Sequence, residues 1–319
     1  MAEYNLEEVW IYSRYGFDIS CYGKAAGNGE TAVCDNAADS VKAANKDSVA
    51  DEVAENEHSD MEMFGERLQE AGIRIVSLKK AIEDGILPKE NTLFVTDCPE
   101  IAEHFAKNNL PVLGILMPQN ENAPFAGVRY LSEGWDDITP IYLERVYRRY
   151  HSLPWHILET ERCTLRETTE ADVDAFYRIY AEPSVTAFME NLFSDREEEL
   201  RYMADYREKV YALYGFGIWS VILKETGEII GRAGLDIRRG FAEPELGFVI
   251  GVPWQRQGIA EEVCRAILRY GEEELGFTKV QALTEQENTA SLALLKKLGF
   301  VFDGEYEEMG KEYLRYLKK

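Results

Sequence analysis

The sequence has few cysteines, no long apolar run and no recognisable leader at its start. Its 319 residues include five widely spaced cysteines without a CxxC pair, which argues against a disulfide framework or a zinc site. No stretch approaches the roughly 18 apolar residues of a membrane span, and the first residues lack the basic and apolar regions of a signal peptide. We therefore expect a cytoplasmic protein with reduced thiols, no membrane partner and no bound metal.

Positive charge is also scarce. The chain has 35 lysines and arginines against 58 aspartates and glutamates, a net charge of −23. Such a surface repels a phosphate backbone, so duplex nucleic acid is a poor partner. Hydrophobic residues nevertheless make up 45% of the chain and aromatic residues 12%. This composition predicts a globular protein, and the length predicts two domains.

Residues 24–60 differ from the rest of the chain in composition. They contain no aromatic residue, and nine acidic residues stand against three lysines. We interpret the segment as a solvated, largely disordered acidic insertion. A weak alanine-rich helix through 41–56 is the alternative. In neither case do we expect the segment to carry catalysis.

The remainder of the first half alternates between short apolar strands and helical stretches. We expect helices at 63–71 and 99–108 and strands at 73–76, 92–96 and 111–116, with a further element from the aromatic-rich start at 9–19. Strand, helix and strand at this spacing predict a βαβ crossover and a parallel sheet. A tryptophan-bearing connection around Pro154 marks the boundary. We therefore predict an α/β domain at 1–152 and a second domain at 153–319.

The second half mixes hairpins with crossovers. The expected strands are at 164–167, 218–223, 228–236, 245–250 and 280–284, followed by two terminal strands, and the expected helices are at 170–180, 196–211, 258–274 and 289–298. The hairpin at 218–236 turns at KETG, where Gly227 can adopt a positive φ. Antiparallel and crossover connections together predict an α+β domain.

The most informative stretch runs from Pro244 to Gly271. A strand leads into a Gln255-x-x-Gly258-x-Ala260 turn, and an amphipathic helix follows at once. Small residues let a ligand approach the backbone, and the first helical turn has unpartnered N–H groups and a partial positive charge. This is an anion site suited to a pyrophosphate. For these six residues alone, an ordinary strand-to-helix turn is the alternative interpretation.

Four segments in a fixed order give a more specific signal. They are RCTLRETTEADVDAFY at 162–177, GEIIGRAGL at 227–235, ELGFVIGVPWQRQGIA at 245–260 and NTASLALLKKLGF at 288–300. On these segments, residues from about 160 to 319 resemble the GCN5-related N-acetyltransferases, known as GNAT enzymes. The resemblance is greatest to the Rim-type ribosomal-protein alanine acetyltransferases. It implies the GNAT acyl-CoA N-acyltransferase fold and acetyl-CoA as cofactor.

The resemblance also implies which residues hold the cofactor. In this family the glycine turn binds the pyrophosphate of acetyl-CoA through backbone amides, and the strand before it splays to pair with the pantetheine arm. Asn288, a good helix N-cap on physical grounds, is a further contact of that arm in relatives. The implied cofactor-binding residues are therefore Val249, Ile250, Gly251, Arg256, Gln257, Gly258, Ile259, Ala260 and Asn288.

Two residues are candidates for proton transfer. Glu245 opens the strand where the family often has a general base, and a carboxylate can take the proton that an ammonium must lose. A solvent-facing acid at a strand end is the alternative. Relatives often use a tyrosine as the acid where this chain has Leu295. Ser291 matches a serine proposed for that role in the Rim branch, or is a small helix residue beside the cofactor.

The first half has a weaker resemblance. Residues 92–114 resemble the last nucleotide-fold segment of haloacid-dehalogenase-like (HAD-like) phosphatases, with Asp97 after the strand. Those enzymes need an aspartate nucleophile with a second aspartate two positions later. The early candidate, Asp18-Ile19-Ser20, lacks the second acid. We therefore expect a noncatalytic HAD-like, or Rossmann-like, α/β domain.

Three functions of different classes follow from these patterns. We expect an N-acetyltransferase that moves acetyl from acetyl-CoA to a primary amine, either a protein N-terminus or a small molecule, in a ternary complex. The alternative is a catalytically weak acyl-CoA-binding regulatory protein. A phosphatase would need Asp18 or Asp97 chemistry that the sequence does not supply. Glu190 and Asp195, in the loop where relatives bind acceptors, would suit a cationic amine or simply face solvent.

Overall fold

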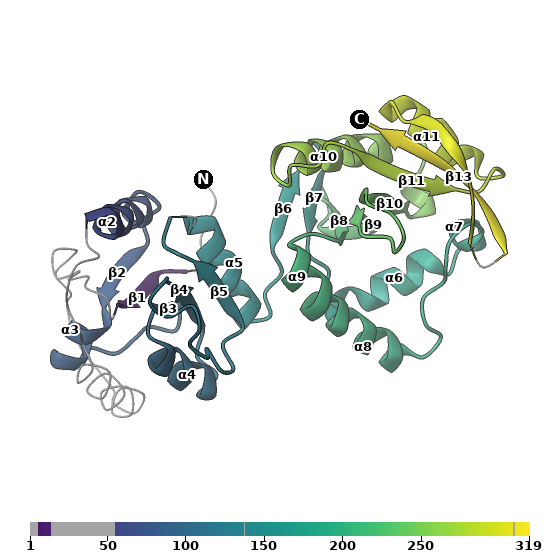
Figure 1. Cartoon of the computed structure of the whole chain (residues 1–319). Helices are drawn as coiled ribbons and strands as arrows, with labels where there is room; N and C mark the ends of the chain where they lie inside the picture. The colour runs from purple at the N-terminus through teal and green to yellow at the C-terminus, as the bar shows by residue number, and fades with distance from the viewer. Residues whose placement is uncertain (1–5, 14–54, 137, 309) are drawn as a thin grey trace. The chain divides into compact units, whose positions relative to one another are not determined.

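The computed structural model describes residues 6–13, 55–136, 138–308 and 310–319. The chain divides into two compact units, Met1–Leu153 and Pro154–Lys319 (Figure 1). Within the described ranges, no helix combines the length and the apolar character that crossing a membrane requires. Each unit is considered by itself below.

The first unit has a five-stranded sheet whose described neighbours all pair in parallel. Its strands are β1 (Glu8–Tyr12), β2 (Arg74–Ser77), β3 (Thr92–Thr96), β4 (Val112–Leu116) and β5 (Tyr130–Glu133). The order β2-β1-β3-β4-β5 is one of the common orders of doubly wound sheets. The predicted parallel sheet is therefore confirmed.

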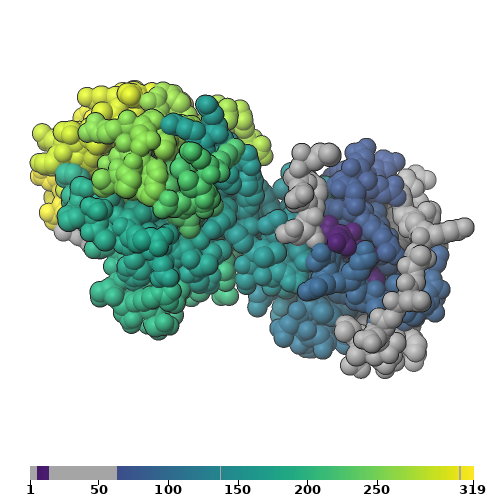
Figure 2. Space-filling model, turned by 180° about the vertical axis from the view of Figure 1, so that it is seen from behind, coloured from purple at the N-terminus to yellow at the C-terminus, as the bar shows by residue number. Residues whose placement is uncertain are grey.

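Helices cover both faces of this sheet. On one face, α2 (Glu55–Glu70) and α5 (Pro140–Tyr150) pack on a cluster that includes Val9 and Ile11. On the other, α3 (Leu78–Glu83) and α4 (Pro99–Lys107) pack on a cluster that includes Trp10 and Tyr12. All five residues of β1 are buried, as expected of a central strand covered on both sides. In Figure 2 this segment shows only as a small purple patch.

The predicted insertion is wrong at its C-terminal end. Helix α2 begins at Glu55, so residues 55–60 are helical rather than disordered. Phe64 and Leu68 of the same helix are buried in the core. Once packing holds those turns, the helix can extend into the acidic sequence without a second nucleation cost, because each further residue that is fixed adds one hydrogen bond. Residues 24–54, with nearly all of the alternative helix at 41–56, lie outside the described residues.

The second unit is an eight-stranded mixed sheet in the order β12-β13-β11-β10-β9-β8-β7-β6. Its strands are β6 (His156–Glu159), β7 (Cys163–Arg166), β8 (Ile218–Leu223), β9 (Glu228–Asp236), β10 (Glu245–Ile250), β11 (Val280–Thr284), β12 (Val301–Glu308) and β13 (Lys311–Lys318). β10 pairs with β11 in parallel, and the other pairs are antiparallel. The predicted α+β class is confirmed for this half.

Helices lie on both sides of the second sheet (Figure 1). They are η3 (Glu170–Asp172), α6 (Val173–Tyr180), α7 (Pro183–Thr186), α8 (Arg196–Tyr206), η4 (Arg207–Tyr211), α9 (Ala212–Tyr214), η5 (Val252–Trp254), α10 (Ile259–Glu273) and α11 (Thr289–Leu298). The η4 turn is a π-helical continuation of α8. Helices α6 and α8 pack on the face that carries Val249, and α10 packs on the opposite face.

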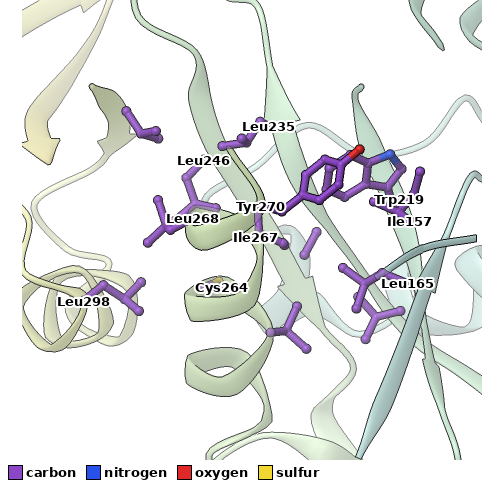
Figure 3. Close-up of a cluster of buried hydrophobic side chains, with 14 of the residues drawn as sticks. Ile157, Leu165, Trp219, Leu235, Leu246, Cys264, Ile267, Leu268, Tyr270 and Leu298 are labelled. Atoms are coloured by element: carbon purple, nitrogen blue, oxygen red, sulfur yellow. The ribbon is translucent and has the colours of Figure 1, made fainter. Parts of the chain in front are cut away.

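The core beneath α10 is the largest cluster of this unit (Figure 3). Trp219 of β8 is fully buried, and its ring meets the edge of Tyr270 of α10 at a centroid distance of 5.7 Å. Cys264 and Ile267 of the same helix are also fully buried. This apolar contact fixes α10 against β9 and β10, and so fixes the turn that begins the helix.

Candidate active site

The site begins where two parallel strands separate. β10 pairs with β9 along its whole length, from Glu245 opposite Asp236 to Ile250 opposite Gly231. Its pairing with β11 is restricted to Glu245 opposite Gln281. Beyond that point the edge of β10 that faces β11 has no strand partner in the described structure. The sheet therefore opens along β10 toward α10.

Alternation decides which peptide groups of β10 face this opening. Gly251 N–H donates to Ile230 O at 2.8 Å, so the N–H of residue 251 points toward β9. Successive residues of a strand direct their peptide groups alternately to its two edges. The peptide groups of Val249 therefore also face β9, whereas those of Phe248 and Ile250 face the opening. Gln255 Nε2 already donates to Ile250 O at 2.8 Å. The open edge therefore offers the N–H of Ile250 and the peptide groups of Phe248.

This alternation bears on two of the predicted pantetheine contacts. Gly251 uses its N–H toward Ile230, and its carbonyl accepts a hydrogen bond from Trp254 N at 2.9 Å. Both of its backbone groups are engaged within the protein. Val249 presents its peptide groups to β9 and its side chain to the cluster beneath α6. Of the three predicted positions, Ile250 is the one whose N–H faces the opening.

The turn after β10 is exposed and lacks a side-chain cap. Gly258 is the N-cap of α10 and has a φ of 80°, and Arg256 has a φ of 61°. No described residue accepts a hydrogen bond from the backbone N–H groups of residues 256–260. Left-handed residues in such a turn orient successive N–H groups toward the same side. With the helix dipole, this creates a concentrated positive potential for an anion.

Arg162, which the sequence did not single out for a role, immediately precedes β7 and contacts this turn. Its Nη1 donates to Gln257 O at 2.9 Å, and its Nε donates to Glu262 Oε2 at 2.6 Å. Burial raises the pKa of Glu262, but hydrogen bonds from Thr160 and from Arg162 outweigh burial and hold the pKa below its usual value. Arg162 thus neutralises the acid in the first turn of α10 and fixes the carbonyl that precedes Gly258.

Glu245 lies at the point where the strands separate, and its side chain is only 18% exposed. It is therefore not the solvent-facing acid of the alternative interpretation. Arg238 Nη1 lies 3.2 and 3.1 Å from its two carboxylate oxygens, and Arg238 also pairs with Glu308. Burial raises the pKa of Glu245, and Arg238 offsets part of that rise. Arg238 had no signal in the sequence, because its partners come from β10 and β12.

A second carboxylate accompanies Glu245. Asp236 lies directly opposite it on β9. Burial raises the pKa of Asp236, partly offset by hydrogen bonds from Ile237 N–H and the Tyr206 hydroxyl and by the charge of Arg232. Asp195 has another role: its side chain caps α8 by accepting from Glu197 N at 3.0 Å. Glu190 is exposed.

Asn288 and Ser291 lie together at the start of α11. Asn288 caps the helix as predicted on physical grounds, with its Oδ1 accepting from Ser291 N at 3.1 Å. The Ser291 side chain is partly buried. Leu295, one turn further on, is 1% exposed and belongs to the core cluster beneath α10. Leu295 is thus a packing residue.

Comparison with known proteins identifies the second half. A family model described as an acetyltransferase (GNAT) domain matches residues 162–301. The uncharacterized N-acetyltransferase p20 of Bacillus licheniformis is 30% identical over 148 residues, which are 46% of this chain and 83% of that protein. The uncharacterized N-acetyltransferase YoaA of Bacillus subtilis is 32% identical over 155 residues, which are 46% of this chain and 84% of that protein.

Among solved structures, the chain resembles a putative GNAT-family acetyltransferase from Bordetella pertussis. The sequence identity is 23% and the TM-score 0.46, and the match covers 52% of this chain and 100% of that chain. The family model matches the strands and helices that form the opened sheet and the uncapped turn. The chain belongs to the GNAT family, and its second half is an N-acetyltransferase with the acyl-CoA N-acyltransferase fold and acetyl-CoA as its cofactor.

Proposed function

We propose that the protein transfers acetyl from acetyl-CoA to a primary amine by direct attack in a ternary complex. The observation that carries this proposal is the course of β10. The strand parts from β11 at a carboxylate, Glu245, and ends at a turn whose N–H groups have no partner in the described structure. One strand thereby links a proton acceptor to an anion site.

The residues present fit the cofactor. The N–H groups of residues 256–260 and the positive end of α10 suit the two phosphates of its pyrophosphate. The N–H of Ile250 and the peptide groups of Phe248 suit the amides of its pantetheine arm, which would extend the sheet as an added strand does. Asn288 would contact the same arm from α11. Bound acetyl-CoA supplies an activated acetyl group as a thioester.

Glu245 is the proposed general base. An amine substrate arrives mainly as an ammonium and must lose a proton before its nitrogen can form the new amide bond. The ordinary pKa of a glutamate is too low for efficient proton abstraction near neutral pH, and burial raises the pKa of Glu245 in the useful direction. Arg238 keeps enough of the carboxylate ionised to accept the proton.

Ser291 is the proposed acid, which would donate a proton to the departing thiolate of CoA and regain one from solvent. Its support is its position in the first turn of α11 beside Asn288, together with Leu295 where a tyrosine is usual. Both features fit the Rim branch of the family, in which we place the chain. A Ser291→Ala variant is expected to lower the turnover number and leave the affinity for CoA unchanged. Unchanged turnover would mean that Ser291 is only a packing residue.

The test of this function is thiol release from acetyl-CoA with a panel of amines, comparing wild type with Glu245→Gln. Loss of a general base commonly lowers the rate by about 10² to 10⁴-fold. Calorimetry should give the same CoA affinity for both proteins. Glu228→Gln, an exposed glutamate at the start of β9, is the matched control and should behave as wild type. Wild-type-like turnover by Glu245→Gln would contradict the assignment.

A CoA-binding regulatory protein is the second candidate, favoured by the packing of Leu295 in place of the family's acid. The same experiment separates the two functions. Tight CoA binding without thiol release for any amine would favour regulation.

For the first unit we propose a noncatalytic HAD-like domain. Asp97 follows β3 and is 1% exposed, and its Oδ2 accepts a hydrogen bond from the Ser13 hydroxyl at 2.5 Å. Asn120 Nδ2 donates to the carbonyl of the same aspartate at 2.6 Å. A carboxylate buried in this way is poorly placed to attack phosphate. Asp18 and Ser20 lie outside the described residues. Hydrolysis of a generic phosphate ester with Mg²⁺ that is lost on Asp97→Asn would overturn this proposal.

A further inference from the structure

Arg232 of β9 has no ion-pair partner in the described structure, although the charge of Asp236 on the same strand interacts with it and the Tyr180 side chain of α6 hydrogen-bonds to it. Its Nε is shielded from solvent and has no hydrogen-bond partner, and no described carboxylate lies within ion-pair distance of the guanidinium. Its guanidinium carbon lies 4.8 Å from the ring centre of Phe176 of α6. Shielded charges in proteins are normally paired, because desolvation is costly. The unpartnered Nε and the lack of an ion pair leave this guanidinium with a donor that an anion could use.

Arg232 shares one face of the sheet with the proposed base. Residues 232, 234 and 236 of β9 point to the same side, and they lie opposite 249, 247 and 245 of β10. The face is therefore lined by Arg232 and Val249 at one end and by Asp236 and Glu245 at the other. It is the face covered by α6 and α8, opposite the core beneath α10. A cationic end and an anionic end thus lie along one pair of strands.

The position between the two ends on β10 has no side chain. Gly247 separates Glu245 from Val249, and a Cβ built there would have only Ile218 Cδ1 within 4 Å, at 3.1 Å. On β9, the matching Gly234 is covered by the carbonyl of Gly217, at 2.0 Å from where its Cβ would lie. The free approach to the face is therefore over β10, beside the base.

Two tyrosines of α8 lie near both the cationic end and the anionic end of this face. Tyr202 and Tyr206 interact electrostatically with Arg232 and also with Asp236. The Tyr206 hydroxyl is held by Ile218 N at 2.9 Å, and Tyr202 is 44% exposed. The two rings form an apolar surface between the charges of Arg232 and Asp236, and the ring of Tyr202 is in contact with solvent.

From this arrangement we infer that Arg232 binds an anionic group of the acceptor, so that the enzyme selects amines that also carry a carboxylate. This inference rests on the proposed function. A guanidinium binds a carboxylate through two parallel hydrogen bonds, and its unpartnered Nε is one of the required donors. Four residues of β10 span about 13 Å. The anionic group should therefore be several bonds from the amine, beyond the reach of an α-carboxylate.

The experiment compares ω-amino acids with their carboxamides, which differ in charge but little in shape. The substrates are 4-aminobutanoate, 6-aminohexanoate, 8-aminooctanoate and the amide of each. They are assayed with wild type, Arg232→Met and Arg232→Lys. The control is Arg201→Met, which changes an exposed arginine of α8. For at least one length, wild type should favour the carboxylate by at least about tenfold in kcat/KM, since a site built for a polar group rejects analogues that lack it. The preference should disappear in Arg232→Met and be reduced in Arg232→Lys.

Binding of the acetylated products makes the test independent of turnover. 6-Acetamidohexanoate and its shorter and longer homologues are titrated into the CoA-saturated protein. At least one should bind wild type and Arg201→Met, and bind Arg232→Met at least about tenfold more weakly. Arg232→Met should lower the melting temperature little, because the guanidinium has no ion pair to lose and its removal relieves a desolvation cost that offsets the lost contacts with Tyr180 and Phe176. Failure of all three homologues to bind wild type, or a much lower melting temperature of Arg232→Met, would overturn the inference. A chain that releases thiol without preferring carboxylates would overturn it and leave the proposed function standing.

Discussion

Glu245 of β10 pairs with Gln281 of β11 at the point where the two parallel strands part. Gln281 is fully buried, its N–H donates to Pro244 O at 2.9 Å, and its Oε1 accepts from Arg315 Nε at 2.8 Å. The pair is therefore held firmly on the closed side of the sheet. The proposed base thus occupies a rigid position at the start of the opening, where an amine and a thioester could meet.

The first prediction concerns the pH dependence that Arg238 imposes on Glu245. Catalysis needs the ionised carboxylate, so activity should fall as the pH drops through the pKa of Glu245. Arg238 favours the ionised form and keeps that pKa lower than burial alone would leave it. Arg238→Met should therefore move the acidic limb of the kcat/KM profile to higher pH, with activity recovering above it. Arg239→Met, an exposed neighbour, is the control. A limb that stays in place or moves to lower pH would rule out Glu245 as the titrating base.

The second prediction concerns how the charges of Arg162 and Glu262 at the cofactor turn change the affinity for CoA. Arg162→Met leaves Glu262 as an uncompensated anion in the first turn of α10, so CoA should bind more weakly, by roughly two- to tenfold. Glu262→Gln alone should change the affinity little, and the double variant should bind better than Arg162→Met. The differences should shrink as salt rises, because both charges are partly exposed. Additive losses in the double variant would show that Arg162 acts only through packing.

Much of the second unit could be predicted from its sequence. The strands Ile218–Leu223, Glu228–Asp236 and Glu245–Ile250 have the predicted bounds. Their apolar and β-branched runs are interrupted by turn residues, so local chemistry defines both ends. The uncapped glycine turn could be predicted for the same reason.

Other features depend on contacts that a linear pattern does not record. Helix α5 was not predicted, because its many charged residues obscure the apolar pattern. Thr139 as N-cap and Pro140 in the first turn nevertheless indicate the start of a helix. Arg162 and Glu262 are a hundred positions apart. The alternation that turns the peptide groups of Gly251 away from the opening depends on the pairing with β9. That Arg232 lacks an ion-pair partner and an Nε hydrogen bond could be recognised only once its surroundings were known.

The third prediction is that residues 153–319 fold and bind CoA without the first unit. The two units have separate hydrophobic clusters, and the turn and the opened sheet lie wholly in the second. The fragment should unfold cooperatively. CoA at 100 times its dissociation constant should stabilise it by roughly 2.7 kcal/mol. An insoluble fragment, or one whose melting ignores CoA while the full chain responds, would mean that the units depend on each other.

The central claim is that the turn before α10 holds acetyl-CoA, and calorimetric titration of acetyl-CoA into the full chain tests it most directly. Gly258→Val is compared with Gly276→Val, because both glycines have a positive φ, 80° and 70°, but Gly276 lies outside the turn and has nothing within 4 Å of a built Cβ. Both variants carry the backbone strain, and only the first puts a side chain where the phosphates would approach. We predict that Gly258→Val weakens binding at least tenfold, or about 1.4 kcal/mol, and that Gly276→Val binds as wild type does. Equal affinity of wild type and Gly258→Val would contradict the account.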